Sequence, residues 1–179
     1  MTRLARASWM VLALLIIVTA PASAESPDEV FSFANHLKRD GLNEAAAQQF
    51  LRFARENPTD GRAPEALLSA ADCLNASGGT EQAVTVLEAI VSTYPDHPEQ
   101  CRVQVQLGRL YAKLDRYDEA DRTFTRVAVT MPDCALVPDA LLGKGEALMA
   151  QKNFAAASEV LRTVVESHVE SKAAPRAAY

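Results

Sequence analysis

A period of 37 residues runs through this chain, and it restricts the possible folds more than any other feature of the sequence. Residues of one kind recur at that spacing in several columns. The clearest columns are Ala46, Ala83, Ala120 and Ala157; Phe50, Leu87, Phe124 and Leu161; and Pro27, Pro64, Cys101, Pro138 and Pro175. A fixed period of about 20–50 residues is typical of architectures in which one supersecondary unit stacks on the next. The units here are about 27–63, 64–100, 101–137 and 138–174, and a fifth begins at 175.

Within each unit the apolar residues are spaced as in two α-helices. In the second unit, four apolar residues lie at i, i+3, i+4 and i+7, on one helical face. They are Leu67, Ala70, Ala71 and Leu74. The pair Gly78-Gly79 interrupts this helix, and Pro95 ends the next one, because a residue before proline is displaced from helical geometry. The pattern predicts an all-α fold with helices near 28–39, 43–56, 62–76, 80–93, 98–113, 117–130, 136–150 and 154–168.

A column of small residues has a steric explanation. Its members are Ala34, Ala71, Gly108 and Gly145. Each lies where the first helix of a unit is expected to approach its second helix, and a larger side chain would push the two apart. Large apolar residues are expected to fill the remaining space, so that each unit completes the core of its neighbour.

The N-terminus has the pattern of a secretory signal peptide. Two arginines are followed by an apolar run at 9–18 and by the small-residue sequence at 22–24. The run is short for a membrane span. We therefore expect residues 1–24 to be removed and a periplasmic or secreted protein to begin at Glu25, with no further membrane span. The alternative is an inner-membrane anchor through residues 9–20.

The charge of the expected mature chain argues against two classes of partner. Without the two arginines of the leader, 16 basic residues face 23 acidic ones, a net charge of −7. Such a balance disfavours nucleic acids and anionic lipid surfaces. The length of 25–179 suits one domain.

Three motifs in the third unit together resemble a known repeat. They are Leu107-Gly108-x-x-Tyr111, Tyr117-x-x-Ala120-x-x-x-Phe124 and Pro132. Their order of small and large residues is similar to that of the tetratricopeptide repeat, whose common form has about 34 residues, and the resemblance covers 25–179. It implies a right-handed α-solenoid with an adaptor role. The loop at 94–98 resembles those of bacterial envelope members, namely the repeat domain of the Tol–Pal division coordinator and the repeat lipoprotein of outer-membrane barrel assembly.

The resemblance also implies a concave groove lined by the first helix of each unit. It assigns three columns of groove residues to a protein or peptide partner. These are the apolar Phe31, Leu68, Val105 and Leu142; the polar Asn35, Asp72, Arg109 and Glu146; and a third column in which Arg39 and Lys113 alternate with alanines. Arg109 is the best anchor candidate, because a guanidinium can bind a carboxylate with two parallel bonds. Two alternatives stay open: Arg109 could pair with Asp72 or Glu146, and the apolar column could be ordinary packing between units.

No pattern of catalytic or metal-binding residues stands out in the sequence. The histidines, His36, His97 and His168, fall at different places in the repeat and do not converge with cysteines or carboxylates. Motifs for zinc, phosphate or nucleophilic catalysis do not occur. We therefore expect a non-catalytic scaffold without metal or cofactor.

The cysteines suggest one covalent link. Cys101 begins the first helix of the third unit, and Cys134 lies in the loop that leaves that unit, at the same end of the helix pair. In an oxidising compartment the two could form a disulfide. The alternative is two free thiols about one repeat apart, too distant to bridge. Cys73 is expected to be a small buried apolar residue.

The last complete helix is expected to leave part of Val160, Leu161 and Val164 uncovered. A solenoid normally covers such a face with a polar terminal helix. Three explanations compete: the sequence is a fragment, the protein self-associates end to end, or a partner covers the face. They match three functional hypotheses, which are an envelope scaffold that binds a partner segment in its groove, the N-terminal repeat region of a longer envelope enzyme or transport component, and a structural oligomer.

Overall fold

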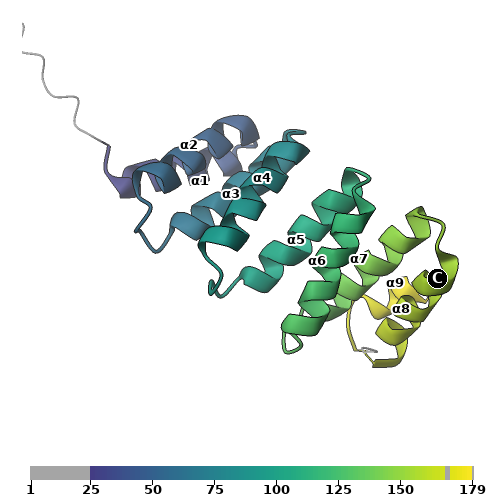
Figure 1. The fold of residues 1–179 in the computed structure, drawn as a ribbon. Coiled ribbons are helices and arrows are strands. Elements are labelled where there is room, and N and C mark those ends of the chain that lie inside the picture. Colours follow the sequence, from purple (N-terminus) through teal and green to yellow (C-terminus); the bar gives the residue numbers. More distant parts are fainter. Residues whose placement is uncertain (1–24, 168–169, 179) are drawn as a thin grey trace, which may run out of the picture.

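The computed structural model describes residues 25–167 and 170–178, so the signal-peptide prediction lies outside it. Within these residues, successive helix pairs stack side by side into a right-handed α-solenoid, as the repeat predicts (Figure 1). The first helices of the four repeats are α1 (Pro27–Arg39), α3 (Ala63–Ala76), α5 (Gln100–Lys113) and α7 (Val137–Ala150). The second helices are α2 (Asn43–Glu56), α4 (Thr80–Thr93), α6 (Tyr117–Thr130) and α8 (Phe154–Ser167), and a short α9 (Ala174–Ala177) follows.

The helix boundaries follow from local chemistry. In α1, Ser26 and Glu29 form a capping box, in which each side chain accepts a hydrogen bond from the backbone N–H of the other. Prolines occupy the first turn of α1, α3, α7 and α9, where a missing N–H costs little. In the second helices of the first three repeats, the C-cap is the residue before a proline, namely Asn57, Tyr94 and Met131.

Each turn between the two helices of a repeat contains one residue in the left-handed region. These residues are Gly41 at φ 76°, Gly78 at 93°, Asp115 at 59° and Lys152 at 61°. They are spaced by the 37-residue period, although only the first two are glycines. The same backbone turn therefore occurs four times. In the last two repeats a non-glycine residue adopts this conformation, which is less favourable for a residue with a side chain.

The core is assembled by large side chains of the second helices that press on small residues of the first helices. Phe124 of α6 is fully buried between Gly108 of α5 and Gly143 of α7. A Cβ atom added to either glycine would lie 2.6 Å from the Phe124 ring. Gly145 is similarly covered by the side chain of Leu161. The steric explanation of the small column is thus seen directly.

A disulfide joins Cys101, at the start of α5, to Cys134 in the loop between α6 and α7, with Cα atoms 6.6 Å apart. It ties the start of α5 to the loop after α6, at the same end of the third repeat. Cys73 lies buried in α3 as a free thiol, and burial raises its pKa.

The C-terminal face is better covered than the sequence indicates. Val164 is fully buried, because Ala173 and Ala177 of the segment around α9 pack against it together with Leu142. Leu161 and Val160 are half-buried. The expectation that Val164 stays uncovered is therefore corrected: the start of a fifth unit shields it.

Replacing Gly108 by leucine should destabilise the fold by about 1–3 kcal/mol, because the new side chain would overlap the Phe124 ring. Urea unfolding followed by circular dichroism measures the change. Gly61→Leu is the matched control: a Cβ there meets no atom within 4 Å, so its effect should stay within about 0.5 kcal/mol. Equal stability of both variants would contradict the steric account.

Candidate functional site: the groove over the first helices

A groove of about 530 Å³ runs over the first helices of repeats one to three. Side chains from α1, α3, the start of α5 and the residue before it line the groove. They are Asn35, Lys38, Arg39, Glu65, Leu68, Ser69, Asp72, Glu99 and Arg102. Three basic and three acidic side chains face each other here, so the surface is polar with balanced charge. It suits a segment that carries both signs of charge.

Asp72 lies at the centre of this charge network. Its carboxylate is 3.7 Å from Lys38 Nζ and 3.9 Å from Arg102 Nη2, and it accepts a hydrogen bond from the side-chain amide of Gln106. These contacts connect α1, α3 and α5. Asp72 therefore holds three successive repeats in register rather than standing ready for a ligand.

Two charged groove residues are not used in this way. Arg39 is exposed, and its Nε reaches only the backbone oxygen of Asn35, at 3.4 Å. Glu65 is exposed and makes no ion pair or side-chain hydrogen bond with any residue in the described ranges. A ligand could bind both groups without breaking an ion pair of the fold.

The polar column of the sequence analysis forms ion pairs between neighbouring repeats. Asp72 faces Arg102 at 3.9 Å, Arg109 binds Asp139 at 2.7 Å and Glu146 binds Arg176 at 2.7 Å. Each pair joins the middle of one first helix to the start of the next, 30 residues later. The expectation for Arg109 is corrected here, because its partner is Asp139 and not Asp72 or Glu146. At the first junction the column holds the uncharged Asn35.

The expected apolar strip is not open to a ligand. Leu68, Val105 and Leu142 have exposed fractions of 4%, 3% and 3%, because they pack between successive helices. Of the two readings left open by the sequence, the structure favours packing between units. Only Leu68 borders the groove.

Phe31, the first member of the apolar column, belongs to a cluster at the N-terminal end of the solenoid. Its half-buried ring packs on Phe50 and Phe53, with centroid separations of 5.8 and 5.1 Å. The guanidinium of Arg62 lies over Phe31, 5.3 Å from the ring centroid. The ring is therefore occupied by contacts within the fold.

Arg62 also forms two ion pairs, with Asp60 at 2.7 Å and with Asp28 at 2.8 Å. The hydrogen bonds that the Arg62 side chain and backbone N–H donate to the Asp60 carboxylate lower the pKa of Asp60 to about 2, from 3.8. The same bond to Asp60, with that to Asp28, raises the pKa of Arg62. The cluster links α1, α2 and the start of α3.

The structure brings together only part of the predicted site. Asn35, Arg39, Leu68 and Asp72 share the groove, whereas Val105, Arg109, Lys113, Leu142 and Glu146 lie outside it. Lys113 donates to the Asn75 side chain at 2.7 Å. The groove residues that the sequence analysis missed are Lys38, Glu65, Ser69, Glu99 and Arg102. Helical spacing could have found the first three, because each lies three or seven positions from a predicted residue on the same face.

The described part of the chain contains no group of three or more histidine, cysteine or acidic side chains that could hold a metal ion. It contains no helix long and apolar enough to cross a membrane. The histidines that the structure describes, His36 and His97, bond only to backbone groups near them in sequence.

Comparison with known proteins identifies the family. The tetratricopeptide repeat family matches residues 31–98 and 105–178. The chain belongs to the tetratricopeptide repeat family. No curated protein matches it in sequence.

Solved structures of tetratricopeptide repeat proteins have the same fold. A repeat protein from Parabacteroides merdae superposes with a TM-score of 0.71 at 15% identity, covering 86% of this chain and 58% of that one. MamA residues 41 to the end, from Desulfovibrio magneticus RS-1, gives a TM-score of 0.65 at 19% identity, covering 87% of this chain and 92% of that one. Another MamA structure gives 0.68 at 14% identity, covering 83% and 82%. At such identities the likeness shows the fold alone, and the closer resemblance to Tol–Pal and barrel-assembly repeats stays a prediction.

The Asp60–Arg62 pair should make the stability of this tetratricopeptide repeat domain depend on acidity in a defined window. As the pH falls through about 4, an unfolded Asp60 takes up a proton while the folded one stays ionised until about pH 2. The advantage of wild type over Asp60→Asn in urea midpoint should therefore be full above pH 5 and shrink between pH 4 and 2. A difference that stays constant over that range would contradict the depressed pKa.

Proposed function

We propose that this protein is a non-catalytic protein-interaction scaffold of a bacterial cell envelope, and that it binds a segment of a partner protein in the groove over α1, α3 and α5. The observation that carries the proposal is the pair of unused charges, Arg39 and Glu65, in a groove whose other charges already hold the repeats together. A bound segment would place an acidic side chain on Arg39 and a basic one on Glu65.

Family membership supports the scaffold role, since tetratricopeptide repeats generally bind proteins and stack into a rigid frame. The groove offers about 530 Å³ along three successive repeats, and grooves of this kind take extended or helical segments of partner proteins. Its mixed charge fits a polar segment of alternating sign better than a purely apolar one, because the leucine at its base is almost fully buried.

Site-specific crosslinking tests the groove. A photoreactive benzoylphenylalanine at position 39 should crosslink to one partner in the native host, whereas the same group at exposed Glu159 of α8 should not. The double variant Arg39→Glu, Glu65→Lys should then weaken that partner's binding by at least about tenfold, because each reversal turns an attraction into a repulsion.

The matched control is Arg126→Glu on α6, which reverses an exposed charge outside the groove and should leave binding unchanged. Circular dichroism should show equal helicity in all variants, since none of these side chains forms an ion pair within the described residues. Unaltered binding by the double variant, or equal crosslinking from position 159, would overturn the groove assignment.

Export to an oxidising compartment is the second part of the proposal. The leader-like sequence at 1–24 and the Cys101–Cys134 disulfide both fit it. Intact, unreduced mass of the protein from its native host should match a chain that begins at Glu25 and is two hydrogens lighter than its reduced form. A chain that retains residues 1–24 would oppose cleavage, and three reactive thiols after unfolding would oppose the disulfide.

Self-association is a second candidate function with an observation in its favour. Phe154 is 64% exposed at the C-terminal face, beside Met149 and Leu161, and these residues line a pocket of about 460 Å³. Such apolar exposure is typical of interfaces. The reading of these repeats as the front of a longer envelope enzyme or transport component remains a further alternative, which the intact mass also tests.

A further inference from the structure

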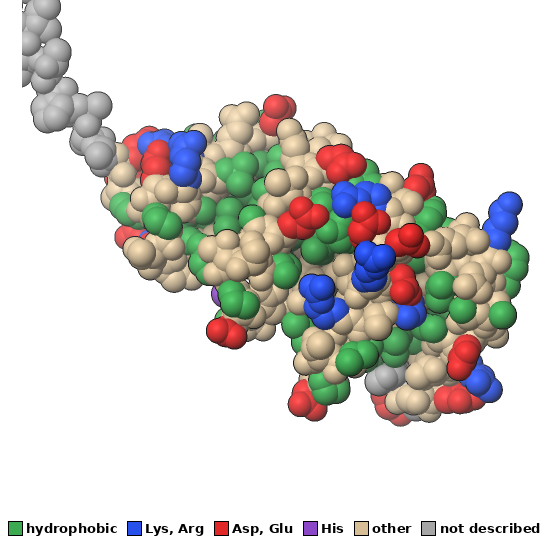
Figure 2. Space-filling view, viewed as in Figure 1, with side chains coloured by type: hydrophobic (Ala, Val, Ile, Leu, Met, Phe, Trp, Pro, Cys, Tyr) green, Lys and Arg blue, Asp and Glu red, His purple; other side chains and the backbone are tan. Residues whose placement is uncertain are grey.

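A second pocket lies between the second helices α2 and α4 and shares no residue with the groove over the first helices. It measures about 370 Å³, at the lower end of the range for ligand pockets. Its apolar floor is formed by Ala47, Leu51, Leu74 and Val86. Its polar rim is formed by Glu44, Gln48, Gln82 and Thr85. Hydrophobic side chains accordingly gather over α2 and α4 in Figure 2, with charged side chains at the N-terminal end and farther along the solenoid.

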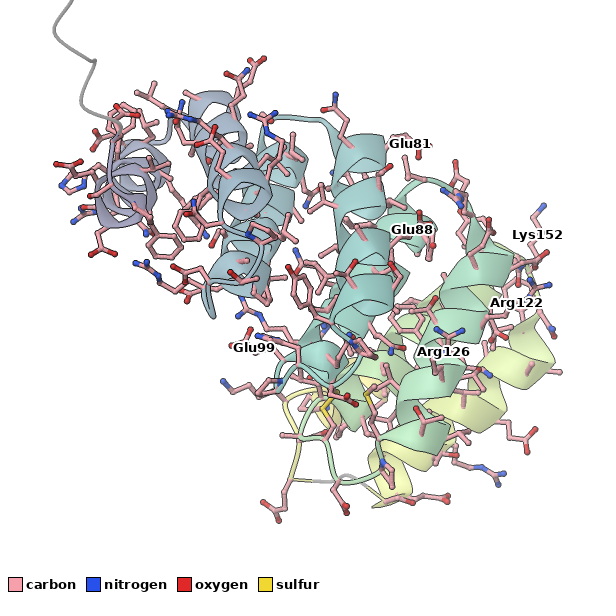
Figure 3. The ribbon with its side chains drawn as sticks, turned by 60° about the vertical axis from the view of Figure 1, so that its left-hand side comes forward. Glu81, Glu88, Glu99, Arg122, Arg126 and Lys152 are labelled. Atoms are coloured by element: carbon pink, nitrogen blue, oxygen red, sulfur yellow. A yellow bond between two sulfur atoms is a disulfide. The ribbon has the colours of Figure 1, made fainter. Side chains whose placement is uncertain are left out.

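The equivalent place one repeat later, between α4 and α6, is partly filled by the protein's own side chains, which leave a smaller pocket of about 240 Å³. The ring of Tyr111, 7% exposed, lies under the guanidinium of Arg116, which is 4.6 Å from the ring centroid. Arg116 is held on one side by Glu81 of α4, at 3.6 Å, and on the other by Glu119 of α6, at 3.1 Å. The Tyr111 hydroxyl donates to Glu88. Glu81 and Glu88 lie along α4, and Arg122 and Arg126 lie along the neighbouring α6 (Figure 3).

The 37-residue period shows what differs at the α2–α4 pocket. Leu74 stands in the place of Tyr111, Gly79 in that of Arg116, and Leu51 in that of Glu88. Glu44 corresponds to Glu81. Glu44 is exposed and forms no ion pair or side-chain hydrogen bond in the part of the chain that the structure describes.

The backbone has nearly the same conformation at the two equivalent positions before α4 and α6. Gly79 has φ −78° and ψ 53°, and Arg116 has φ −86° and ψ 62°. The ring and the guanidinium that the next repeat supplies are thus absent from the α2–α4 pocket. Of the two acidic partners of Arg116, Glu81 corresponds to Glu44, whereas Glu119 corresponds to the uncharged Gln82. The acceptor for a phenolic hydroxyl is replaced by Leu51, which favours a ring without a hydroxyl.

We propose that the α2–α4 pocket binds a segment of a second protein that presents a phenylalanine side chain next to an arginine. The ring packs on Leu51, Leu74 and Val86, and the guanidinium stacks over it and pairs with Glu44. Ring burial supplies most of the affinity, and the exposed Glu44 supplies orientation and selectivity. This site goes beyond the proposed function, because its residues other than Leu74 of α3 lie on the second helices α2 and α4, and its occupancy does not require a ligand in the first-helix groove.

Methyl NMR with defined dipeptides tests the proposal. Titration of the labelled chain with N-acetyl-phenylalanyl-arginine amide should shift the methyl signals of Leu51, Leu74 and Val86 in a saturable way. N-acetyl-phenylalanyl-glutamate amide should bind about five- to tenfold more weakly, because one exposed ion pair becomes a repulsion. N-acetyl-alanyl-arginine amide should bind at least about tenfold more weakly, because it lacks the ring.

The matched variant rebuilds the filled arrangement of the next repeat. Leu74→Tyr with Gly79→Arg places the missing ring and guanidinium inside the chain, and it should abolish the shifts at Leu51 and Val86. A Cβ at Gly79 would lie 2.6 Å from the flexible end of the Gln82 side chain, which can move, and 3.3 Å from the backbone oxygen of Leu74, which requires a shift of a few tenths of an ångström. Glu44→Arg, an exposed change that leaves the floor intact, is the second variant and should reverse the preference between the arginine and glutamate dipeptides.

Several results would overturn the proposal. One is the absence of saturable shifts at these methyls. Another is equal shifts at Val91 and Leu107, which line the smaller α4–α6 pocket. A third is a dipeptide preference that Glu44→Arg leaves unchanged. Concentration-dependent dimerisation that the filled variant abolishes would instead make a second copy the occupant, through its exposed Phe33 or Phe154.

Discussion

The fold depends on one steric constraint, the pressing of a large side chain on a small residue where two helices cross. Phe124 between Gly108 and Gly143 is the clearest example, since even a methyl group on either glycine would meet the ring. The constraint fixes how closely successive helices pack and therefore sets the same crossing four times. Because helix positions and turn conformations repeat, residues 37 apart occupy equivalent places, and differences between them carry information about function.

Ion pairs also link the successive repeats. The pairs Asp72–Arg102, Arg109–Asp139 and Glu146–Arg176 occupy one equivalent place, and their polarity alternates from junction to junction. Exposed pairs of this kind contribute little stability. However, a shift by one repeat would bring Asp72 against Asp139, so the alternation opposes misalignment. The first junction lacks such a pair, because Asn35 carries no charge. Glu65, which lies 30 residues after Asn35 at the partner position, therefore lines the groove instead of forming this ion pair.

The sequence predicted most of the fold and less of the site. Prolines, glycines and helical spacing placed every long helix within two residues of its observed bounds, because these signals are local. The left-handed Asp115 and Lys152 were visible only through the period that they share with Gly41 and Gly78. The burial of Leu68, Val105 and Leu142 depends on the spacing between successive first helices, which no single residue encodes. The partner of Arg109 was missed because the pairing offset is 30 residues and not 37.

Different substitutions between repeats leave the first-helix groove and the α2–α4 pocket open to a ligand. In the first-helix groove, Asn35 replaces a charge, so its counterpart Glu65 forms no ion pair with any residue that the structure describes. At the α2–α4 pocket, Leu74 and Gly79 replace Tyr111 and Arg116, so Glu44 and an apolar floor stay uncovered. Both sites arise where a repeat omits side chains that another repeat supplies, on a backbone that does not change. A scaffold with sites on separate helix layers can hold two partners at once, which raises the effective concentration of each for the other.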